Sequence, residues 1–190
     1  MNDEQFLVLN CVYLRKLVPA AAVAECTALP PDAVDRALAA VTGAGRALDV
    51  GGGQYMLSEA GTQAVLAEYG QRYAAERQDA FCTDWYDRFE LLNSQFLTGI
   101  SAWQRAGDDG QLDRLLRLVE RQIKALDGIS GRVPRYRTYR DRFERAIERV
   151  DHGQAEFVVS PSVDSIHNIW FEFHEDILTL LGRPRDVAGT

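Results

Sequence analysis

Long apolar runs are absent from this 190-residue chain. A membrane-spanning helix needs about 20 consecutive apolar residues, and no stretch of the sequence approaches that length. The first residues, MNDEQFLVLNCVYL, are acidic before their apolar run. A secretory signal peptide instead carries positive charge at that place and a small-residue cleavage site after it. We therefore expect a cytoplasmic protein with no membrane partner.

Cysteine and histidine are scarce, with three of each. The cysteines Cys11, Cys26 and Cys82 lack the spacing of zinc ligands, and we interpret them as reduced thiols. The triple glycine at 51–53 is not a phosphate-binding loop, because no Lys-Ser or Lys-Thr follows it. No Gly-x-Ser-x-Gly turn of a serine hydrolase occurs either. We expect no cofactor, no metal and no catalytic activity by this chain alone, and the question of activity stays open.

A net positive charge is also missing. The chain has 21 basic and 28 acidic side chains, for a formal net charge of −7. Nucleic acid repels an acidic protein, so a DNA-binding role would require a local basic patch. The composition is otherwise that of an ordinary globular protein, and the length allows one large or two small domains.

The first 61 residues contain short helices followed by a hairpin. Apolar residues recur with helical spacing, and turn residues separate the segments. Pro31 and Asp32 open the third helix, the triple glycine joins two strands, and Ser58 is a suitable N-cap for the next helix. The expected helices cover 4–17, 20–26 and 31–43, and the strands 46–50 and 54–57. This order predicts an N-terminal winged helix-turn-helix domain at 1–61.

Residues 62–190 are expected to form an α-helical domain, which makes the protein mainly α. The chain favours helix from 62 to 106, with Gly70 and Gly99 as candidate breaks, so the two domains could share one continuous helix. Aromatic residues recur along this segment, and we expect a homodimer through it. Further helices are predicted at 111–126 and from Pro134 to 150, an extended segment at 157–160, and a last helix capped by Asp164 or Ser165 and ended by Gly182.

The chemistry of the expected winged helix disfavours DNA. Residues 1–65 hold four basic and seven acidic side chains, and four minus seven gives −3. The helix that would read bases is alanine-rich and the wing has no basic residue, although phosphate contacts supply most non-specific affinity. Protein contact or dimerisation is the favoured use, and DNA stays open. The candidate residues for DNA or partner binding are Asp32, Asp35, Arg36, Arg46 and Gly52.

Seven arginines between residues 132 and 149 form the basic stretch of the chain. Guanidinium groups bind phosphate well, so Arg135, Arg137 and Arg140 are candidates for binding a phosphorylated ligand or an acidic partner. The alternative is a solvated helix face with ion pairs one turn apart, such as Arg140 with Glu144. The alternative is favoured.

The last helix carries His167, Trp170, Phe171 and His174 on one predicted face. Two histidines seven residues apart cannot chelate one metal without other ligands, and the HExxH motif is absent. One interpretation is a pocket for a flat aromatic ligand, to which Trp103 would contribute. The other is a filled core with hydrogen-bonded histidines.

The C-terminal run DSIHNIWFEFHEDILTLLGRPR resembles a signature of a group of actinobacterial winged-helix proteins, roughly D-S-[YF]-H-x-V-W-[FM]-E-L-H-E-D-L-L-x-T-L-G-x-x-R. Weaker agreement covers CTDW at 82–85, LLNSQFL at 91–97, the Trp-Gln pair at 103–104, 143–153 and the LSEAG segment after the wing.

That resemblance implies two functions, and the first of them is preferred because the resemblance supplies it more directly. Members of the group are commonly described as MarR-like transcriptional regulators, which implies a ligand-sensing or dimerisation domain after the winged helix. The same module is similar to one found with phosphoenolpyruvate-utilising phosphotransferases related to pyruvate phosphate dikinase. The second implication is a non-catalytic accessory or substrate-recognition subunit whose winged helix contacts protein. No catalytic residue is carried over by the resemblance.

Overall fold

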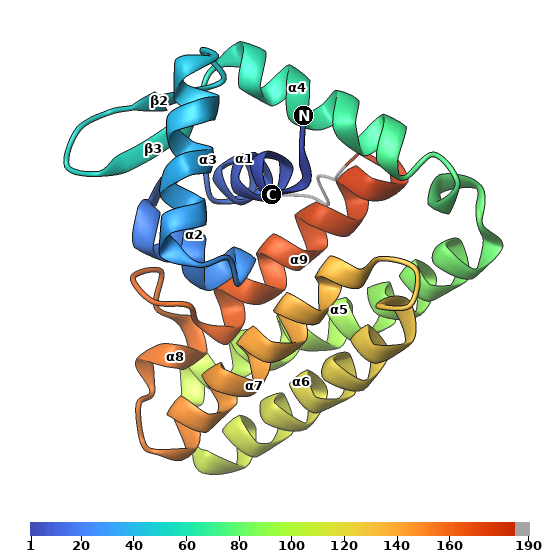
Figure 1. Ribbon diagram of the computed structural model, residues 1–190. Coiled ribbons are helices and arrows are strands. Elements are labelled where there is room, and N and C mark those ends of the chain that lie inside the picture. Colours follow the sequence, from blue (N-terminus) through green and yellow to red (C-terminus); the bar gives the residue numbers. More distant parts are fainter. Residues whose placement is uncertain (185–190) are drawn as a thin grey trace. The chain divides into compact units, whose positions relative to one another are not determined.

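The computed structural model describes residues 1–184 and is mainly helical, as predicted, with one small sheet (Figure 1). Arg185, the last residue of the signature, and the end of the predicted domain at 62–190 lie outside the described residues. The elements are α1 (Asp3–Arg15), β1 (Leu17–Pro19), α2 (Ala20–Thr27), α3 (Pro31–Gly43), β2 (Ala47–Asp49), β3 (Gln54–Leu57), α4 (Glu59–Arg72), η1 (Glu76–Gln78), α5 (Ala80–Ala106), α6 (Asp109–Ile129), η2 (Pro134–Tyr136), α7 (Arg137–Asp151), α8 (Glu156–Val159) and α9 (Ile166–Leu181).

The chain forms two compact units. Among the described residues, the N-terminal unit comprises Met1–Ala75 together with 178–184, and the C-terminal unit comprises Glu76–Ile177. The helix α9 therefore begins in one unit and ends in the other. The boundary between the units in the first half of the chain follows α4, whereas the predicted domain boundary at residue 61 precedes most of that helix.

Local sequence signals account for the helices of the N-terminal unit. A capping box between Asn2 and Gln5 starts α1, and Pro31 occupies the first turn of α3, where its missing N–H costs no hydrogen bond. Apolar residues on α1, α2 and α3 meet in one core. Its fully buried members include Val8, Val12, Val18, Val23, Val34 and Leu38.

A three-stranded antiparallel sheet completes this core. The strand order is β1-β3-β2, with Leu17 opposite Met56 and Leu48 opposite Met56. The predicted hairpin is confirmed, and Gly51, Gly52 and Gly53 at its tip all have positive φ, which costs glycine little. The strand β1 was not expected, because three residues ending in proline give no alternating pattern.

The helix α4 packs on α1 through a T-shaped contact of Phe6 with Tyr69, whose ring centroids lie 5.5 Å apart. Ser58 caps α4 as predicted, since its Oγ accepts a hydrogen bond from the Gly61 N–H at 3.0 Å. The Gly61 position has no room for a side chain, because a Cβ there would lie 1.8 Å from the Arg46 carbonyl oxygen. The close approach of the Arg46 backbone therefore requires glycine at position 61.

One helix, α4, crosses the predicted domain boundary at residue 61, and the helical segment 62–106 is broken near Gly70, one of the two candidate breaks. The helix α4 ends at Arg72, shortly after Gly70, and a segment that contains η1 precedes α5. Asp79 starts α5 afresh by accepting a hydrogen bond from the Phe81 N–H at 2.9 Å. Gly99 lies inside α5 without ending it.

Aromatic rings fill the interior of the C-terminal unit. Trp170 of α9 stacks on Phe96 of α5 with ring centroids 4.0 Å apart and an interplanar angle of 3°. Phe173 of α9 meets Phe89 and Tyr136 edge-on. The aromatics of α5 are thus largely used inside their own unit, and the predicted dimer through α5 stays a prediction.

The ends of α9 agree with the sequence. Ser165 precedes the helix and accepts a hydrogen bond from the Asn168 N–H at 3.3 Å, and Gly182 follows it with φ of +66°. The expected extended segment at 157–160 is wrong, because most of it forms the short helix α8. β-branched valines suit a strand, but this segment has no neighbouring strand with which to pair. Among residues 1–184, no helix is long and apolar enough to span a membrane.

Candidate functional site

A buried carboxylate, Asp176, binds the second half of α9 to residues of η2 and α7. Asp176 is fully buried and accepts two hydrogen bonds from the Arg135 guanidinium. It also accepts hydrogen bonds from the hydroxyls of Tyr136 at 3.0 Å and Tyr139 at 2.9 Å. Burial, reinforced by the nearby Asp176 charge, raises the pKa of Tyr139 well above its usual value, so this hydroxyl stays protonated and donates. The cluster satisfies a charge that would be unstable alone.

A second buried ion cluster holds the first half of α9. Arg142 of α7 is 2% exposed and donates to both carboxylate oxygens of Asp164, at 2.9 and 2.7 Å. The same guanidinium donates to Glu172 of α9 at 2.6 Å. Asp164, Trp170, Glu172 and Asp176 all belong to the signature run. Much of the sequence resemblance is therefore carried by residues that tie the part of α9 up to Ile177 to the rest of the C-terminal unit.

The predicted anion-binding arginines have different surroundings. Arg135 is engaged by Asp176. Arg140 lies 3.1 Å from Glu144 and 3.6 Å from Asp127, which confirms the alternative of ion pairs one turn apart for this residue. Arg137 is exposed. Two of the three guanidinium groups are thus paired with carboxylates of the chain.

The aromatic and histidine residues of α9 divide between the interior and its edge. Trp170 is buried, and its indole N–H donates to Asn93 at 2.9 Å. His174 lies partly exposed, with its Nε2 3.1 Å from Glu90 and 3.4 Å from the Tyr86 hydroxyl. These contacts agree with the interpretation of a filled core with hydrogen-bonded histidines.

The remaining predicted pocket residues lie outside this core. His167 and Phe171 contact each other one turn apart, with ring centroids 4.6 Å apart. Burial lowers the pKa of His167, because the imidazolium form loses hydration. Trp103, near the end of α5, is half-buried. None of the hollows described below is lined by any of the five predicted ligand-binding residues.

The exposed face of α3 offers little positive charge. Its one basic residue, Arg36, lies 2.6 Å from the Asp32 carboxylate one turn earlier. The hydrogen bond and charge of Arg36 lower the pKa of Asp32, and those of Asp32 raise the pKa of Arg36. Asp35 is exposed and adds negative charge, and Gly52 is at the tip of the hairpin. The backbone carbonyl of Arg46 accepts hydrogen bonds from Ser58, so this residue fixes the start of α4.

The sheet has an apolar outer row that the sequence argument missed. Leu17, Met56 and Leu48 are paired across β1, β3 and β2, and they are 54%, 40% and 45% exposed. Their neighbours Val18, Ala47 and Leu57 point inward to the core, as the pleat requires. Both faces of the sheet are therefore apolar at its centre. Alternation alone could not have revealed this, because both alternating sets are hydrophobic.

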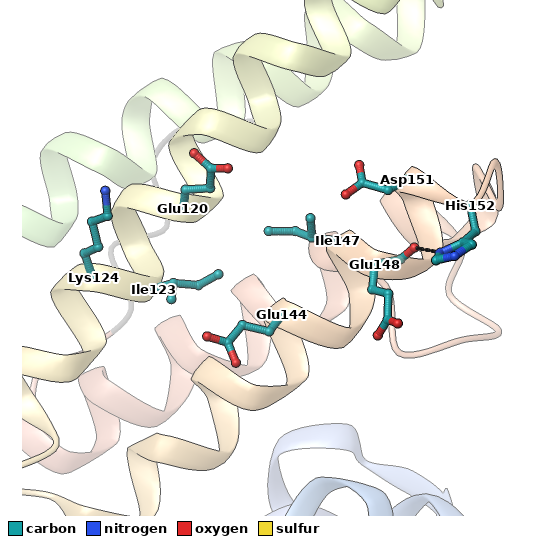
Figure 2. A pocket seen from close by; sticks show the side chains of 8 residues that line it. All are labelled: Glu120, Ile123, Lys124, Glu144, Ile147, Glu148, Asp151 and His152. Carbon is teal, nitrogen blue, oxygen red and sulfur yellow. Dashed lines mark hydrogen bonds between the residues drawn. The ribbon is translucent and has the colours of Figure 1, made fainter.

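A hollow of about 580 Å³ lies between α6 and α7 (Figure 2). Figure 2 shows Glu120 and Lys124 on one helix and Glu144, Glu148 and Asp151 on the other. Ile123 and Ile147 supply its apolar surface, and His152 lies at one end with its Nδ1 2.6 Å from the Glu148 carbonyl oxygen. Within residues 1–184, no group of three or more His, Cys, Asp or Glu side chains could hold a metal ion.

The edge of α6 that faces α5 is mainly basic, and Lys124 lines hollows on both edges of the helix. Two hollows between α5 and α6 are lined by Arg88 of α5 and by Arg114, Arg117, Arg121 and Lys124 of α6. The sequence signal that could have found them is the spacing of the four α6 residues at i, i+3, i+7 and i+10, which places them on one helix face. The amphipathic pattern of leucines in this segment drew the interpretation to its apolar face instead of to these four basic residues.

Comparison with known protein families, with curated proteins and with solved structures finds no match to this chain.

Proposed function

We propose that the N-terminal unit is a winged-helix module that binds protein, and that the chain is a non-catalytic accessory protein. The helix order and the strand order β1-β3-β2 support a winged-helix arrangement. The observation that carries protein binding is the exposed apolar row of Leu17, Met56 and Leu48. Contiguous exposed apolar side chains mark protein contact surfaces more often than nucleic-acid surfaces.

The electrostatics of the same unit support this choice. DNA binding draws on unpaired lysines and arginines along the phosphate backbone. On α3, the sole guanidinium is already bound to Asp32, and Asp35 adds a like charge to the phosphates. The hairpin between β2 and β3 has no basic side chain. A protein partner with an apolar patch is compatible with each of these features.

The sequence resemblance suggests which partner to test. The module it resembles accompanies phosphoenolpyruvate-utilising phosphotransferases of the pyruvate phosphate dikinase type. We propose that the chain is an accessory or substrate-recognition subunit of such an enzyme and contacts it through the sheet.

A second candidate function is a MarR-like transcriptional regulator with a C-terminal ligand-sensing or dimerisation domain. The order of helices and strands favours it, since many winged-helix modules bind DNA. In this function the protein would be a homodimer that binds its own promoter region, and a small aromatic or phosphorylated ligand would modulate the binding.

The deciding experiment compares three tagged full-length proteins purified from the native host: wild type, the double variant Leu48→Lys/Met56→Lys, and the control Leu97→Lys. Leu97 is an exposed leucine of α5 and lines neither α5/α6 hollow. We expect a phosphotransferase in fixed proportion with wild type and the control, and its loss from the double variant. Equal recovery with all three proteins would contradict the proposal.

DNA binding is measured on the same proteins. Salt-sensitive binding of the wild type to its own promoter region, weakened by Arg36→Ala, would replace the accessory function with the regulator. We expect no such binding, because the Arg36 charge is already matched by Asp32.

A further inference from the structure

The two hollows between α5 and α6 form one groove. Their volumes are about 510 and 810 Å³, and both are lined by Leu91, Gln95 and Arg121. They therefore adjoin each other, and we call the combined surface the α5/α6 groove. It lies wholly within the C-terminal unit and has no bearing on the function proposed for the N-terminal unit.

The α5/α6 groove concentrates positive charge in an acidic protein. Five basic residues line it, namely Arg88, Arg114, Arg117, Arg121 and Lys124, and no described carboxylate does. The whole chain has a net charge of −7. The acidic side chains of the same helices, such as Asp87 and Glu120, line neither hollow of the groove.

These basic side chains are not used to hold the unit together. Within residues 1–184, none of the five forms an ion pair with another described residue. Arg121 donates one hydrogen bond to the neutral Gln95 at 3.1 Å, and Arg114 donates one to the Gly110 carbonyl at 3.0 Å. Their charge is therefore available to a ligand, unlike that of Arg135 and Arg142.

The groove is also apolar. Leu91 is 67% exposed, and Phe81, Leu92, Ala102 and Leu118 line the groove beside it. Gly99 contributes no side chain next to α6: a Cβ there would lie 3.6 Å from side-chain atoms of Leu115 and Leu118. A ligand that fits this surface must present both carboxylate-like charge and apolar side chains.

We propose that the α5/α6 groove binds an acidic amphipathic helix of a partner protein. The first and last of the four basic residues of α6, Arg114 and Lys124, are ten positions apart, or about 15 Å along the helix. Carboxylates at i, i+3, i+7 and i+10 of a partner helix repeat along the same length, while its apolar stripe covers Leu91 and Leu118. A small anion would engage only one or two of the guanidinium groups. A nucleic-acid backbone would leave the leucines without an apolar partner.

The test uses a defined probe. A fluorescein-labelled 18-residue peptide carries glutamates at i, i+3, i+7 and i+10, leucines on the adjacent face and alanine elsewhere, so that it forms an amphipathic helix. Fluorescence anisotropy with the full-length protein should give a Kd of about 10–100 μM at 50 mM NaCl. Raising NaCl to 300 mM should weaken binding several-fold, because salt screens exposed charges. The same peptide with glutamine in place of glutamate should bind at least tenfold more weakly.

Matched variants locate the site. Arg117→Glu/Arg121→Glu should weaken binding of the acidic peptide at least tenfold, and Leu91→Ser about threefold. Arg137→Glu/Arg145→Glu changes the net charge by the same amount at exposed arginines outside the groove, and it should leave Kd within twofold of wild type. Circular dichroism and Tm check folding, and Arg117→Gln/Arg121→Gln replaces the reversal variant if that variant does not fold.

Three outcomes would overturn the proposal. The first is a Kd weaker than about 1 mM for the acidic peptide. The second is equal loss of binding in the groove variant and in Arg137→Glu/Arg145→Glu, which would indicate attraction by net charge alone. The third is tighter binding of a random-sequence DNA duplex than of the peptide, lost with Arg117→Glu/Arg121→Glu, which would assign the groove to nucleic acid.

Discussion

Two arginine-rich helices of the C-terminal unit use their charge in opposite ways. Two arginines at α7, Arg135 just before the helix and Arg142 within it, face inward and are bound to carboxylates that lie on α9 or just before it. The arginines of α6 face outward, and Arg117 and Arg121 have no carboxylate partner among the described residues. The difference does not come from the local sequence, because both helices carry acidic residues as well. It comes from what the fold places opposite each helix.

This comparison shows that an arginine cluster in a sequence does not by itself identify a binding site. Arg135 and Asp176 are 41 residues apart, and only the packing of α9 on α7 brings them together. Two arginines of the stretch at 132–149, Arg135 and Arg142, are therefore bound to carboxylates inside the unit. The arginines of α6, which looked like an ordinary leucine-rich helix, have no carboxylate partner among the described residues.

The largest expected effect is from Asp176→Ala. This change removes the buried carboxylate that accepts hydrogen bonds from the Arg135 guanidinium and two tyrosine hydroxyls, which should reduce the free energy of unfolding by about 3–5 kcal/mol. Urea unfolding followed by tryptophan fluorescence measures it, because all three tryptophans lie in the C-terminal unit. Glu144→Ala, which removes an exposed pair with Arg140, is the control and should cost below about 0.5 kcal/mol. A loss for Asp176→Ala as small as the control would mean that the buried cluster adds nothing.

Arg142→Met should have the second largest effect. It removes the guanidinium that binds Asp164 and Glu172, whose side chains are 17% and 11% exposed and can regain some hydration. We expect a reduction of about 2 kcal/mol in the free energy of unfolding, smaller than for Asp176→Ala. The same urea titration tests it. A free energy of unfolding equal to that of wild type would show that the ion pairs of Arg142 do not stabilise the unit. The contrast between Arg142 and the arginines of α6 would then be lost.

A smaller effect should appear in the pH dependence of stability. Burial lowers the pKa of His167 from its usual 6.5 in the folded state. As pH falls below about 6.5, the His167 side chain of the unfolded chain binds a proton before that of the folded chain, so the free energy of unfolding decreases. The decrease stops below the folded pKa, where both states are protonated. Unfolding at pH 7.5 and pH 5.5 should show less loss for His167→Gln than for wild type, and equal losses would contradict the assignment.

The smallest effect is expected from Arg117→Ala. Because this side chain has no partner among residues 1–184, the free energy of unfolding should change by less than about 0.5 kcal/mol. The measurement is the same urea titration as for Asp176→Ala. A loss above about 1.5 kcal/mol would place Arg117 with the structural arginines of α7 and would remove the basis for a ligand at the α5/α6 groove.

Local signals in the sequence predicted most of the helices well. Apolar periodicity located α1, α3 and α9. Ser58 marked the start of α4, and Ser165 and Gly182 marked the two ends of α9. The misses have local causes. The strand β1 exists only because β3 pairs with it, and α8 is a single turn whose valines favour a strand.

The candidate sites were harder to predict than the fold. Sequence spacing placed Trp170 and His174 on one helix face, but the ring that fills the space beside Trp170 belongs to Phe96, on another helix. The exposed apolar row of the sheet could not be predicted from the sequence either, because the exposure of Leu48 and Met56 depends on which face of the sheet the core covers. Both facts depend on tertiary packing, which local periodicity does not encode.

The course of α9 has a consequence for how such a protein could be inherited or recombined. Because residues 178–184 belong to the N-terminal unit, the C-terminal unit is an uninterrupted segment of chain and the N-terminal unit is not. A single genetic crossover near residue 75 would transfer α9 whole and leave the N-terminal unit without Leu178 and Leu180, both buried. Exchange of either unit therefore requires two breakpoints, one of them inside a helix, so the two units are expected to have been inherited together.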